Sequence, residues 1–213
     1  MLPELKNNIT TVIFDYGGVI SHPQDIEALF KKIFRSSKKA SFSDFRNSYI
    51  NNRREYDRGM ITATEYWNSI GTDLSIEMDN DFIEKLVAED IKSWFNINEE
   101  MIEFIFEIRN KVKHISLLSN INIDCARYLR SNYEWLHKFD SIIFSCDFKI
   151  LKPDEDIYKI CLNSIYDKAN NCLFIDDSGE NVKAGENIGI NGHRFSNIGN
   201  LKKEISEKFI ITR

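Results

Sequence analysis

The segment VIFDYGGV, residues 12–19, decides the fold class that the sequence predicts. Its apolar run predicts a short buried strand at Thr11–Phe14, and Asp15 stands directly after that strand. The two glycines that follow allow a sharp turn and let backbone N–H groups approach an anion closely. Because open α/β sheets bind ligands at the carboxyl ends of their parallel strands, this aspartate marks the expected site.

A regular alternation of helix and strand follows Phe95. Apolar periodicity predicts helices at 99–110, 123–133, 154–165 and 180–187, and strands at 114–118, 141–144, 172–175 and 192–195. The strands are apolar nearly throughout and the connections are short, which indicates a parallel sheet covered by helices on both faces. The predicted fold class is therefore α/β, with a doubly wound parallel sheet as its core.

Residues 22–95 interrupt this alternation, because they contain no convincing strand. Apolar residues recur there at helical spacing, with one set from Ile26 to Phe34 and another from Phe82 to Val87. A stretch of this length is too long for a single crossover. It is predicted to be an inserted helical subdomain, and residues 1–21 together with 96–213 are predicted to form the core domain.

The composition is that of a globular protein. Hydrophobic residues make up 42% of the 213 residues and aromatic residues 12%, which supports a substantial core. A net charge of −5 at pH 7 argues against nucleic acid or an anionic membrane as the main partner, and no segment is long and apolar enough to span a bilayer. The four cysteines are isolated, without a C-x-x-C pair, so we expect packed, reduced thiols and a cytoplasmic protein.

Four polar segments stand at or beside the ends of predicted strands. They contain Asp15, Ser119, Lys152 and the pair Asp176-Asp177. The carboxyl ends of the strands lie together in a doubly wound sheet, so these side chains are expected to meet in one crevice. A carboxylate there can attack an electrophile, and two carboxylates can hold Mg²⁺ together with substrate phosphate. The lysine ammonium and the serine hydroxyl can bind phosphoryl oxygens.

Each segment by itself has a simpler interpretation. An aspartate before two glycines is usually a turn residue, and Lys152-Pro153 alone would be a loop. Asp176-Asp177, followed by Ser178, could cap the next helix. All four segments in order, each at a strand end, are improbable as a coincidence, and this favours a functional site.

The four segments together resemble the motifs of the haloacid dehalogenase-like (HAD) hydrolase superfamily. The motifs fall at Asp15–Val19, Ser119-Asn120, Lys152-Pro153 and Asp176-Asp177 and so cover nearly the whole chain. The insertion resembles the helical C1-type cap of this superfamily. Its segment Asp57-Arg58-Gly59 is similar to a cap segment of small bacterial sugar-phosphate phosphatases in this group.

This resemblance implies a Rossmann-like core and a magnesium-dependent phosphatase for a small phosphorylated metabolite, such as a sugar phosphate. It implies that Asp15 is the nucleophile and forms an aspartyl-phosphate intermediate, with Ser119 and Lys152 as further catalytic residues. The implied magnesium ligands are Asp15, the Gly17 carbonyl oxygen and Asp177, with Asp176 close by or acting through water. The implied substrate contacts are Gly18, Ser119, Asn120 and Lys152. We expect a monomer or weak homo-oligomer.

One position departs from the pattern of these phosphatases. They usually carry a second aspartate two residues after the nucleophile, as general acid and base, and here that residue is Gly17. A glycine keeps the carbonyl oxygen for the metal but loses the proton transfer, which typically contributes about 10²–10⁴-fold. We therefore expect a preference for good leaving groups, such as that of a sugar 1-phosphate. His22 could supply the proton, or it could be a surface residue.

Two other functions fit the same residues. A carbon–halogen hydrolase also uses an aspartate nucleophile and lacks the second aspartate, but it needs no metal and hence no Asp176-Asp177 pair. A HAD-fold binding or regulatory protein could have lost efficient turnover with its acid/base, although Asp15, Lys152 and Asp177 are intact. The inserted subdomain offers side chains that could contact a leaving group or build its own core: Tyr49, Arg53, Arg54, Tyr56, Arg58, Tyr66 and Trp67.

Overall fold

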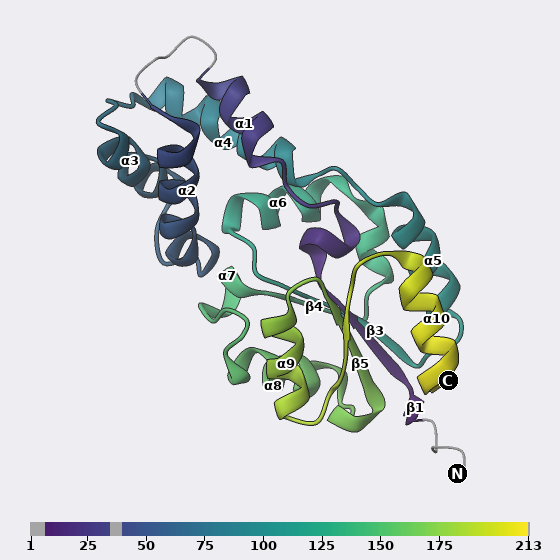
Figure 1. The fold of residues 1–213 in the computed structure, drawn as a ribbon. Coiled ribbons are helices and arrows are strands. Elements are labelled where there is room, and N and C mark those ends of the chain that lie inside the picture. The colour runs from purple at the N-terminus through teal and green to yellow at the C-terminus, as the bar shows by residue number, and fades with distance from the viewer. Residues whose placement is uncertain (1–6, 35–39, 213) are drawn as a thin grey trace.

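Five parallel strands form the central sheet of the computed structural model, which describes residues 7–34 and 40–212 (Figure 1). The strand order is β4-β3-β2-β5-β6. The strands are β2 (Thr11–Phe14), β3 (His114–Ser119), β4 (Ser141–Phe144), β5 (Cys172–Asp176) and β6 (Asn191–Arg194). Each lies where the apolar runs predict it, with its ends shifted by no more than one residue.

The central strand β2 sets the position of Asp15. In the register of the sheet, Phe14 lies opposite Leu117 of β3 and Ile175 of β5. Asp15 continues this pairing through its backbone N–H, which donates to the Ile175 carbonyl oxygen at 2.9 Å. The carboxyl ends of the three middle strands therefore meet beside Asp15, at the edge where open α/β sheets bind ligands.

Helices cover both faces of this sheet (Figure 1). On one face Val12 and Phe14 pack against α5, α6 and α10, and on the other face Ile13 packs against α8 and α9. Alternate residues of a strand point to opposite faces, so a strand buried on both faces is apolar throughout. The helices are α5 (Glu99–Arg109), α6 (Ile123–Asn132), α8 (Glu155–Ile165), α9 (Gly179–Asn187) and α10 (Ile198–Lys208).

The structure also contains elements that the sequence patterns do not predict. β1 (Asn7–Ile9) and β7 (Phe209–Ile211) form a separate parallel pair, and α7 (Ser145–Phe148) follows β4 directly. Three or four residues are too few to show a period, so these elements give no signal. The unpredicted helix α10 does carry apolar residues at helical spacing, such as Leu201 and Ile205.

The helices α1 to α4 form a layer of their own, here called the helical unit. They are α1 (Ile26–Ile33), α2 (Phe42–Asp57), α3 (Ala63–Leu74) and α4 (Asn80–Trp94). Their buried residues form a separate hydrophobic cluster with Tyr66 and Trp67 in it. Figure 1 shows the unit beyond the end of the sheet at which the turn after β2 lies. The chain leaves and returns at adjacent points, because Ser21 forms a β-bridge with Ile97.

A second contact joins the helical unit to the sheet layer at the end of α2, and we call it the α2–α7 contact. Four hydrogen bonds cross it: Ser145 Oγ to the Asp57 carbonyl oxygen (2.6 Å), Tyr56 OH to Asp124 Oδ2 (2.7 Å), Arg58 Nε to the Lys149 carbonyl oxygen (3.1 Å) and Lys149 Nζ to the Gly59 carbonyl oxygen (3.1 Å). Gly59 has a φ of 68° and lies so close to α7 that a Cβ would stand 2.8 Å from the Cys146 carbonyl oxygen. The segment Asp57-Arg58-Gly59 is therefore where the unit rests on α7.

The predicted subdomain boundaries at residues 22 and 95 stay a prediction. Residues 1–6 of the predicted core domain lie outside the described residues. Within the described ranges, no helix is both long enough and apolar enough to span a membrane.

Candidate active site

Asp15 lies at the tip of β2 with its side chain almost entirely buried. Its Oδ1 accepts hydrogen bonds from the Tyr16 N–H at 2.7 Å and from Lys152 Nζ at 2.8 Å. The turn Tyr16–Ile20 ends the strand and is closed by the Ser21 N–H, which donates to the Tyr16 carbonyl oxygen at 2.9 Å. Because both bonds to the Asp15 side chain fall on Oδ1, Oδ2 is the oxygen available to a substrate or a metal.

Gly18 brings the turn after β2 against the loop after β5. Its φ of 71° lies in the left-handed region that favours glycine, and a Cβ there would stand 2.3 Å from Asp177 Oδ2. This close approach sets Asp177 beside Asp15. One carboxylate oxygen from each of Asp15, Asp176 and Asp177 can be chosen so that the three lie within 4.8 Å of one another.

Lys152 is buried between two of these carboxylates. Its Nζ donates to Asp15 Oδ1 at 2.8 Å, to Asp176 Oδ2 at 2.6 Å and to the Leu118 carbonyl oxygen at 2.9 Å, which uses all three of its hydrogens. Asn120 fixes the backbone of Lys152 from both sides, since Asn120 Nδ2 donates to the Lys152 carbonyl oxygen at 2.9 Å and Asn120 Oδ1 accepts from the Lys152 N–H at 2.8 Å. The Asn120 side chain thus positions Lys152. Only the backbone N–H of Asn120 is left for the substrate contact predicted for this residue.

Asp176 and Asp177 are adjacent in sequence but differ in exposure. Asp176 is fully buried and, besides Lys152, accepts from the Ser178 N–H at 2.8 Å and from Asn181 Nδ2 at 3.1 Å, whereas Asp177 is exposed. Ser178 is the N-cap of α9, because its Oγ accepts from the Asn181 N–H. The interpretation of the aspartate pair as the helix cap is therefore wrong. Asn181 supports Asp176 from the first turn of the next helix, a residue that sequence reasoning missed.

The charges of the site are unbalanced. Burial raises the pKa of Asp15 to about 7; Lys152 opposes this shift, while Asp176 and Asp177 add to it. Burial also raises the pKa of Asp177, and the neighbouring Asp176 contributes to the rise. Burial lowers the pKa of Lys152, but Asp15 and Asp176 raise it by more, so the ammonium stays charged. Three carboxylates around one ammonium leave an excess of negative charge.

This donor set suits Mg²⁺, which prefers hard oxygen ligands and keeps several waters. Asp15 Oδ2 and the exposed Asp177 carboxylate are the oxygens that a metal could reach, beside the predicted Gly17 carbonyl ligand. The oxygens of Asp176 are engaged by Lys152, Ser178 and Asn181. Asp176 therefore contributes negative charge and orients Lys152, and its predicted role close to the metal or through water stays a prediction.

Ser119 occupies the buried end of β3, next to β2. Its Oγ lies 3.5 Å from the Asn120 carbonyl oxygen, at the upper limit of hydrogen bonding. Within the part of the chain that the structure describes, the hydroxyl has no stronger partner than this. It can turn toward a ligand without breaking a good hydrogen bond.

A second buried ion cluster lies in the helical unit around Arg53. Its Nε donates to Asp57 Oδ1 at 2.9 Å, and its Nη1 donates to Asp90 Oδ2 and to the Tyr49 hydroxyl oxygen, both at 2.8 Å. The spacing of Arg53 and Asp57 on one helix could have revealed half of this cluster from the sequence. Asp90 comes from α4, and its approach to Arg53 depends on how the helices pack.

Most of the side chains that could have contacted a leaving group are instead buried inside the helical unit. Tyr49, Tyr56, Tyr66 and Trp67 are each at most 2% exposed and pack in its hydrophobic cluster. Arg58 belongs to the α2–α7 contact. The structure thus favours the alternative in which these aromatic side chains build the core of the unit.

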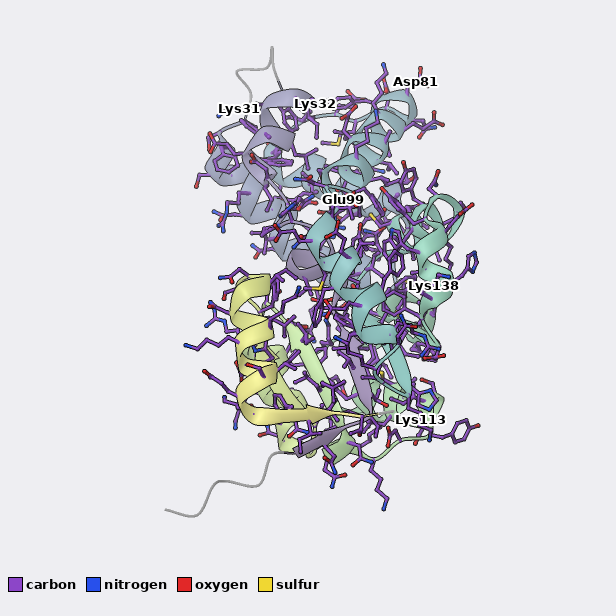
Figure 2. All side chains as sticks on the ribbon, turned by 90° about the vertical axis from the view of Figure 1, so that its right-hand side faces the viewer. Lys31, Lys32, Asp81, Glu99, Lys113 and Lys138 are labelled. Atoms are coloured by element: carbon purple, nitrogen blue, oxygen red, sulfur yellow. The ribbon has the colours of Figure 1, made fainter. Side chains whose placement is uncertain are left out.

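A groove of about 720 Å³ opens beside Gly18 and Asp177. The start of α5, with Glu99 and Glu100, borders it, and so do His22 and the start of α10. Figure 2 shows Glu99 at the end of α5 nearest the helical unit. Among the described residues that line the groove there is no lysine or arginine.

Comparisons with known proteins agree with this geometry. A model of the haloacid dehalogenase-like hydrolase family matches residues 9–189. The sequence is 22% identical to D-ribitol-5-phosphate phosphatase of Bacteroides thetaiotaomicron, over 93% of this chain and 97% of that protein. It is also 26% identical, over 55% of this chain, to bifunctional epoxide hydrolase 2 of Sus scrofa, but spans only 22% of the length of that protein.

The structure is similar to that of a HAD family enzyme from Bacteroides thetaiotaomicron, a wild-type protein solved in complex with magnesium and inorganic phosphate. The TM-score is 0.71 at 20% sequence identity, and the match covers 91% of this chain and 99% of the other. At this identity the likeness concerns the fold, a parallel Rossmann-like sheet with helices on both faces.

Proposed function

The chain belongs to the haloacid dehalogenase-like hydrolase family, and within it we propose a magnesium-dependent phosphatase that acts on a small phosphorylated metabolite through an aspartyl-phosphate intermediate. The observation that carries this proposal is the contact of Lys152 with Asp15, beside the exposed carboxylate of Asp177. The phosphatase named above and the neighbour solved with magnesium and phosphate support it.

In the proposed reaction, Asp15 Oδ2 attacks the phosphorus atom, and the bond from phosphorus to the ester oxygen breaks with its electron pair leaving on that oxygen. Lys152 holds Asp15 in place by its hydrogen bond and attracts the phosphoryl oxygens through its charge, and the Ser119 hydroxyl donates a hydrogen bond to them. Water then attacks the phosphorus of the aspartyl phosphate. The water gives up a proton to solvent, the bond from phosphorus to Asp15 Oδ2 breaks with its electron pair left on Oδ2, and inorganic phosphate leaves.

The magnesium ligands in this proposal are Asp15, Asp177 and the Gly17 carbonyl oxygen. When bound, Mg²⁺ would supply positive charge that neutralises the phosphoryl oxygens. Asp176 keeps Lys152 in its place between the strands. The backbone N–H groups of Gly18 and Asn120 complete the proposed phosphate contacts.

In this proposal, residues 22–95 are the helical cap over the active site. The substrate carries a single phosphate. The groove beside Gly18 and Asp177 offers no lysine or arginine among its described lining residues, and Arg53 is already paired with Asp57 and Asp90. The described lining of the groove therefore offers a second phosphate neither lysine nor arginine. The four cysteines are buried and free, which favours a location in the reducing cytoplasm. The proposed chemistry can be carried out by a monomer or a weak homo-oligomer.

Hydrolysis of p-nitrophenyl phosphate by the purified protein tests the proposal. Turnover should require Mg²⁺, and EDTA should abolish it. With Mg²⁺, beryllium fluoride mimics the phosphoryl group and should raise the Tm of the wild type but not of Asp177→Ala. A panel of phosphorylated sugars then identifies the substrate.

The two competing functions give different results. Release of halide from a haloacid without any metal would establish a carbon–halogen hydrolase. A rise in Tm with beryllium fluoride, in a protein that turns over no phosphate ester, would establish a binding or regulatory protein.

A further inference from the structure

Trp94, the last residue of α4, covers Gly17. A Cβ at position 17 would stand 3.3 Å from Trp94 Cζ3, which is closer than side chains normally pack. The backbone of Gly17 has φ −67° and ψ 129°, a conformation open to any residue. The indole ring, and not the backbone, is therefore what would resist a side chain at this position.

Trp94 is held from both layers of the molecule, its backbone by Tyr16 and its ring by Arg53. In the sheet layer, Tyr16 OH donates to the Trp94 carbonyl oxygen at 3.1 Å. In the helical unit, the Arg53 guanidinium carbon lies 5.3 Å from the centre of the ring, within the range of a cation–π contact. Arg53 is itself fixed by its ion pairs with Asp57 and Asp90. A large movement of the ring away from Gly17 would break its cation–π contact with Arg53.

The space between the ring and the turn after β2 is nearly filled. A cavity of about 20 Å³ remains there, lined by Gly17, Arg53, Trp94, Asn120 and neighbouring residues. A volume of this size has room for about one water molecule. A carboxylate on position 17 would have to displace the ring.

We propose that Trp94 occupies the place that an acid/base side chain at position 17 would take, and so keeps such a side chain out of the site. This inference rests on the proposed phosphatase function. With the ring in place, no side chain at position 17 protonates the ester oxygen as its bond to phosphorus breaks. The accepted substrates are then phosphate esters whose oxygen leaves as a stable anion, such as phenyl, acyl and anomeric sugar phosphates.

Four proteins test this proposal: the wild type, Gly17→Asp, Trp94→Leu and the double variant. Each is assayed with p-nitrophenyl phosphate, a sugar 1-phosphate and a sugar 6-phosphate. Gly17→Asp alone should lose activity on all three, because its carboxylate collides with the ring. In the double variant the sugar 6-phosphate should gain about 10²-fold relative to p-nitrophenyl phosphate, as expected for a restored general acid. Trp94→Leu alone should keep the preference of the wild type.

Trp135→Leu provides a matched control, because Trp135 is a partly buried tryptophan that packs against Tyr133 and Phe139. Gly17→Asp combined with Trp135→Leu should behave like Gly17→Asp alone. If Gly17→Asp alone already accelerates the sugar 6-phosphate, Trp94 does not exclude the acid and the inference is overturned. If the wild type shows no magnesium-dependent hydrolysis of p-nitrophenyl phosphate, the proposed function fails instead.

A stability measurement tests the same contact without turnover. Gly17→Ala adds only the Cβ, and in the wild-type background it should lower Tm by about 2–4 °C, the shift that about 1 kcal/mol of overpacking gives in a chain of this size. In the Trp94→Leu background this loss should vanish. Equal losses of Tm in both backgrounds would show that the two positions do not interact.

Discussion

Two buried cations of this molecule each lie between two carboxylates, but the two clusters differ in what they leave open to a ligand. One is in the sheet layer and one is in the helical unit: Lys152 with Asp15 and Asp176, and Arg53 with Asp57 and Asp90. In the helical unit, Tyr49 OH and Gln24 Nε2 also donate to Asp90, so that cluster is closed on itself. In the sheet layer, Asp177 adds a third, exposed carboxylate, and Arg194 beside it donates through Nε to the Asp177 backbone carbonyl oxygen at 3.3 Å and not to this carboxylate.

The difference shows how one pairing of residue types gives either structure or a site. A buried carboxylate whose hydrogen bonds are all satisfied stabilises the packing around it and offers nothing to a ligand. The sheet cluster keeps Asp15 Oδ2 open and carries excess negative charge beside a groove. It therefore retains the capacity to bind a metal and a phosphate.

The largest contrast is expected between Asp15→Asn and Asp57→Asn. Asp15→Asn removes the attacking charge, so turnover of p-nitrophenyl phosphate should fall to background. Its Tm should not fall, because burial disfavours the ionised form of Asp15. Asp57→Asn removes a partner of Arg53, so it should lower Tm while turnover stays within about tenfold. Full turnover by a folded Asp15→Asn variant would rule out the covalent mechanism.

A smaller contrast is expected when the cations are removed. Lys152→Met should lower kcat/KM by about 10²–10³-fold, as for the loss of one charge-stabilising donor. Arg53→Met leaves two buried carboxylates unpaired and should cost about 3–5 kcal/mol of unfolding free energy. Mg²⁺ should raise the Tm of Lys152→Met. The rise in Tm that Mg²⁺ causes in Arg53→Met should be no larger than the rise in the wild type. Equal rescue of both variants would mean that the helical cluster also binds the metal.

The neutral donors of the two clusters should contribute least to each function. Ser119→Ala removes a hydrogen bond worth about 1 kcal/mol, so kcat/KM should fall only about fivefold, less than for Lys152→Met. Tyr49→Phe removes a hydroxyl that donates to Asp90, and it should lower stability by a similar amount while kcat/KM is kept. Steady-state kinetics and urea unfolding measure the two effects. A loss for Ser119→Ala as large as for Lys152→Met would show that the phosphate contacts are assigned wrongly.

The pH dependence of stability should also separate the site from the rest of the fold. The pKa of Asp15 is raised from 3.8 to about 7, so the folded metal-free protein holds an extra proton and its unfolding free energy falls as pH rises between these values. The pKa of Asp167 is shifted in the opposite direction. Hydrogen bonds from Thr10, Thr11 and Asn171 outweigh partial burial and lower the pKa of Asp167 to about 2, so its contribution is present above 3.8 and is lost as pH falls toward 2.

Urea unfolding across pH, with and without Mg²⁺, measures these two slopes. Mg²⁺ binding requires ionised Asp15, so it should remove the decline between pH 4 and 7, and Asp15→Asn should remove it as well. Asp167→Asn should change only the acid limb. A decline that survives in Asp15→Asn would belong to another group.

Local patterns were enough to predict the sheet and the crevice. The strand ends of β2, β3 and β5 can be read from apolar runs, and parallel order then brings Asp15, Lys152 and Asp176 together. The catalytic and metal-binding roles of these residues stay predictions. The proximity of Asp15 and Asp176 follows from topology, because the carboxyl ends of parallel strands share one edge. Lys152 lies beyond β4 and α7, and its bonds to Asn120 bring it to that edge.

The contacts made by the helical unit could not be predicted in this way. The approach of Trp94 to Gly17 and of Asp90 to Arg53 depends on how helices pack and on where the unit rests, and no periodicity in the sequence encodes either. Asn181 was missed for a similar reason, since its bond to Asp176 depends on the entry angle of α9 into the site.

The α2–α7 contact affects how small molecules could reach the candidate site. Lifting the helical unit breaks these four hydrogen bonds, each worth about 1 kcal/mol, and also the bond from Tyr16 to Trp94, so we expect the lifted form to make up less than about 10⁻³ of the population. Amide exchange at the end of α2 measures this fraction. If the helical unit stays on α7, the groove beside Gly18 and Asp177 is the opening through which the proposed substrate would enter and phosphate would leave.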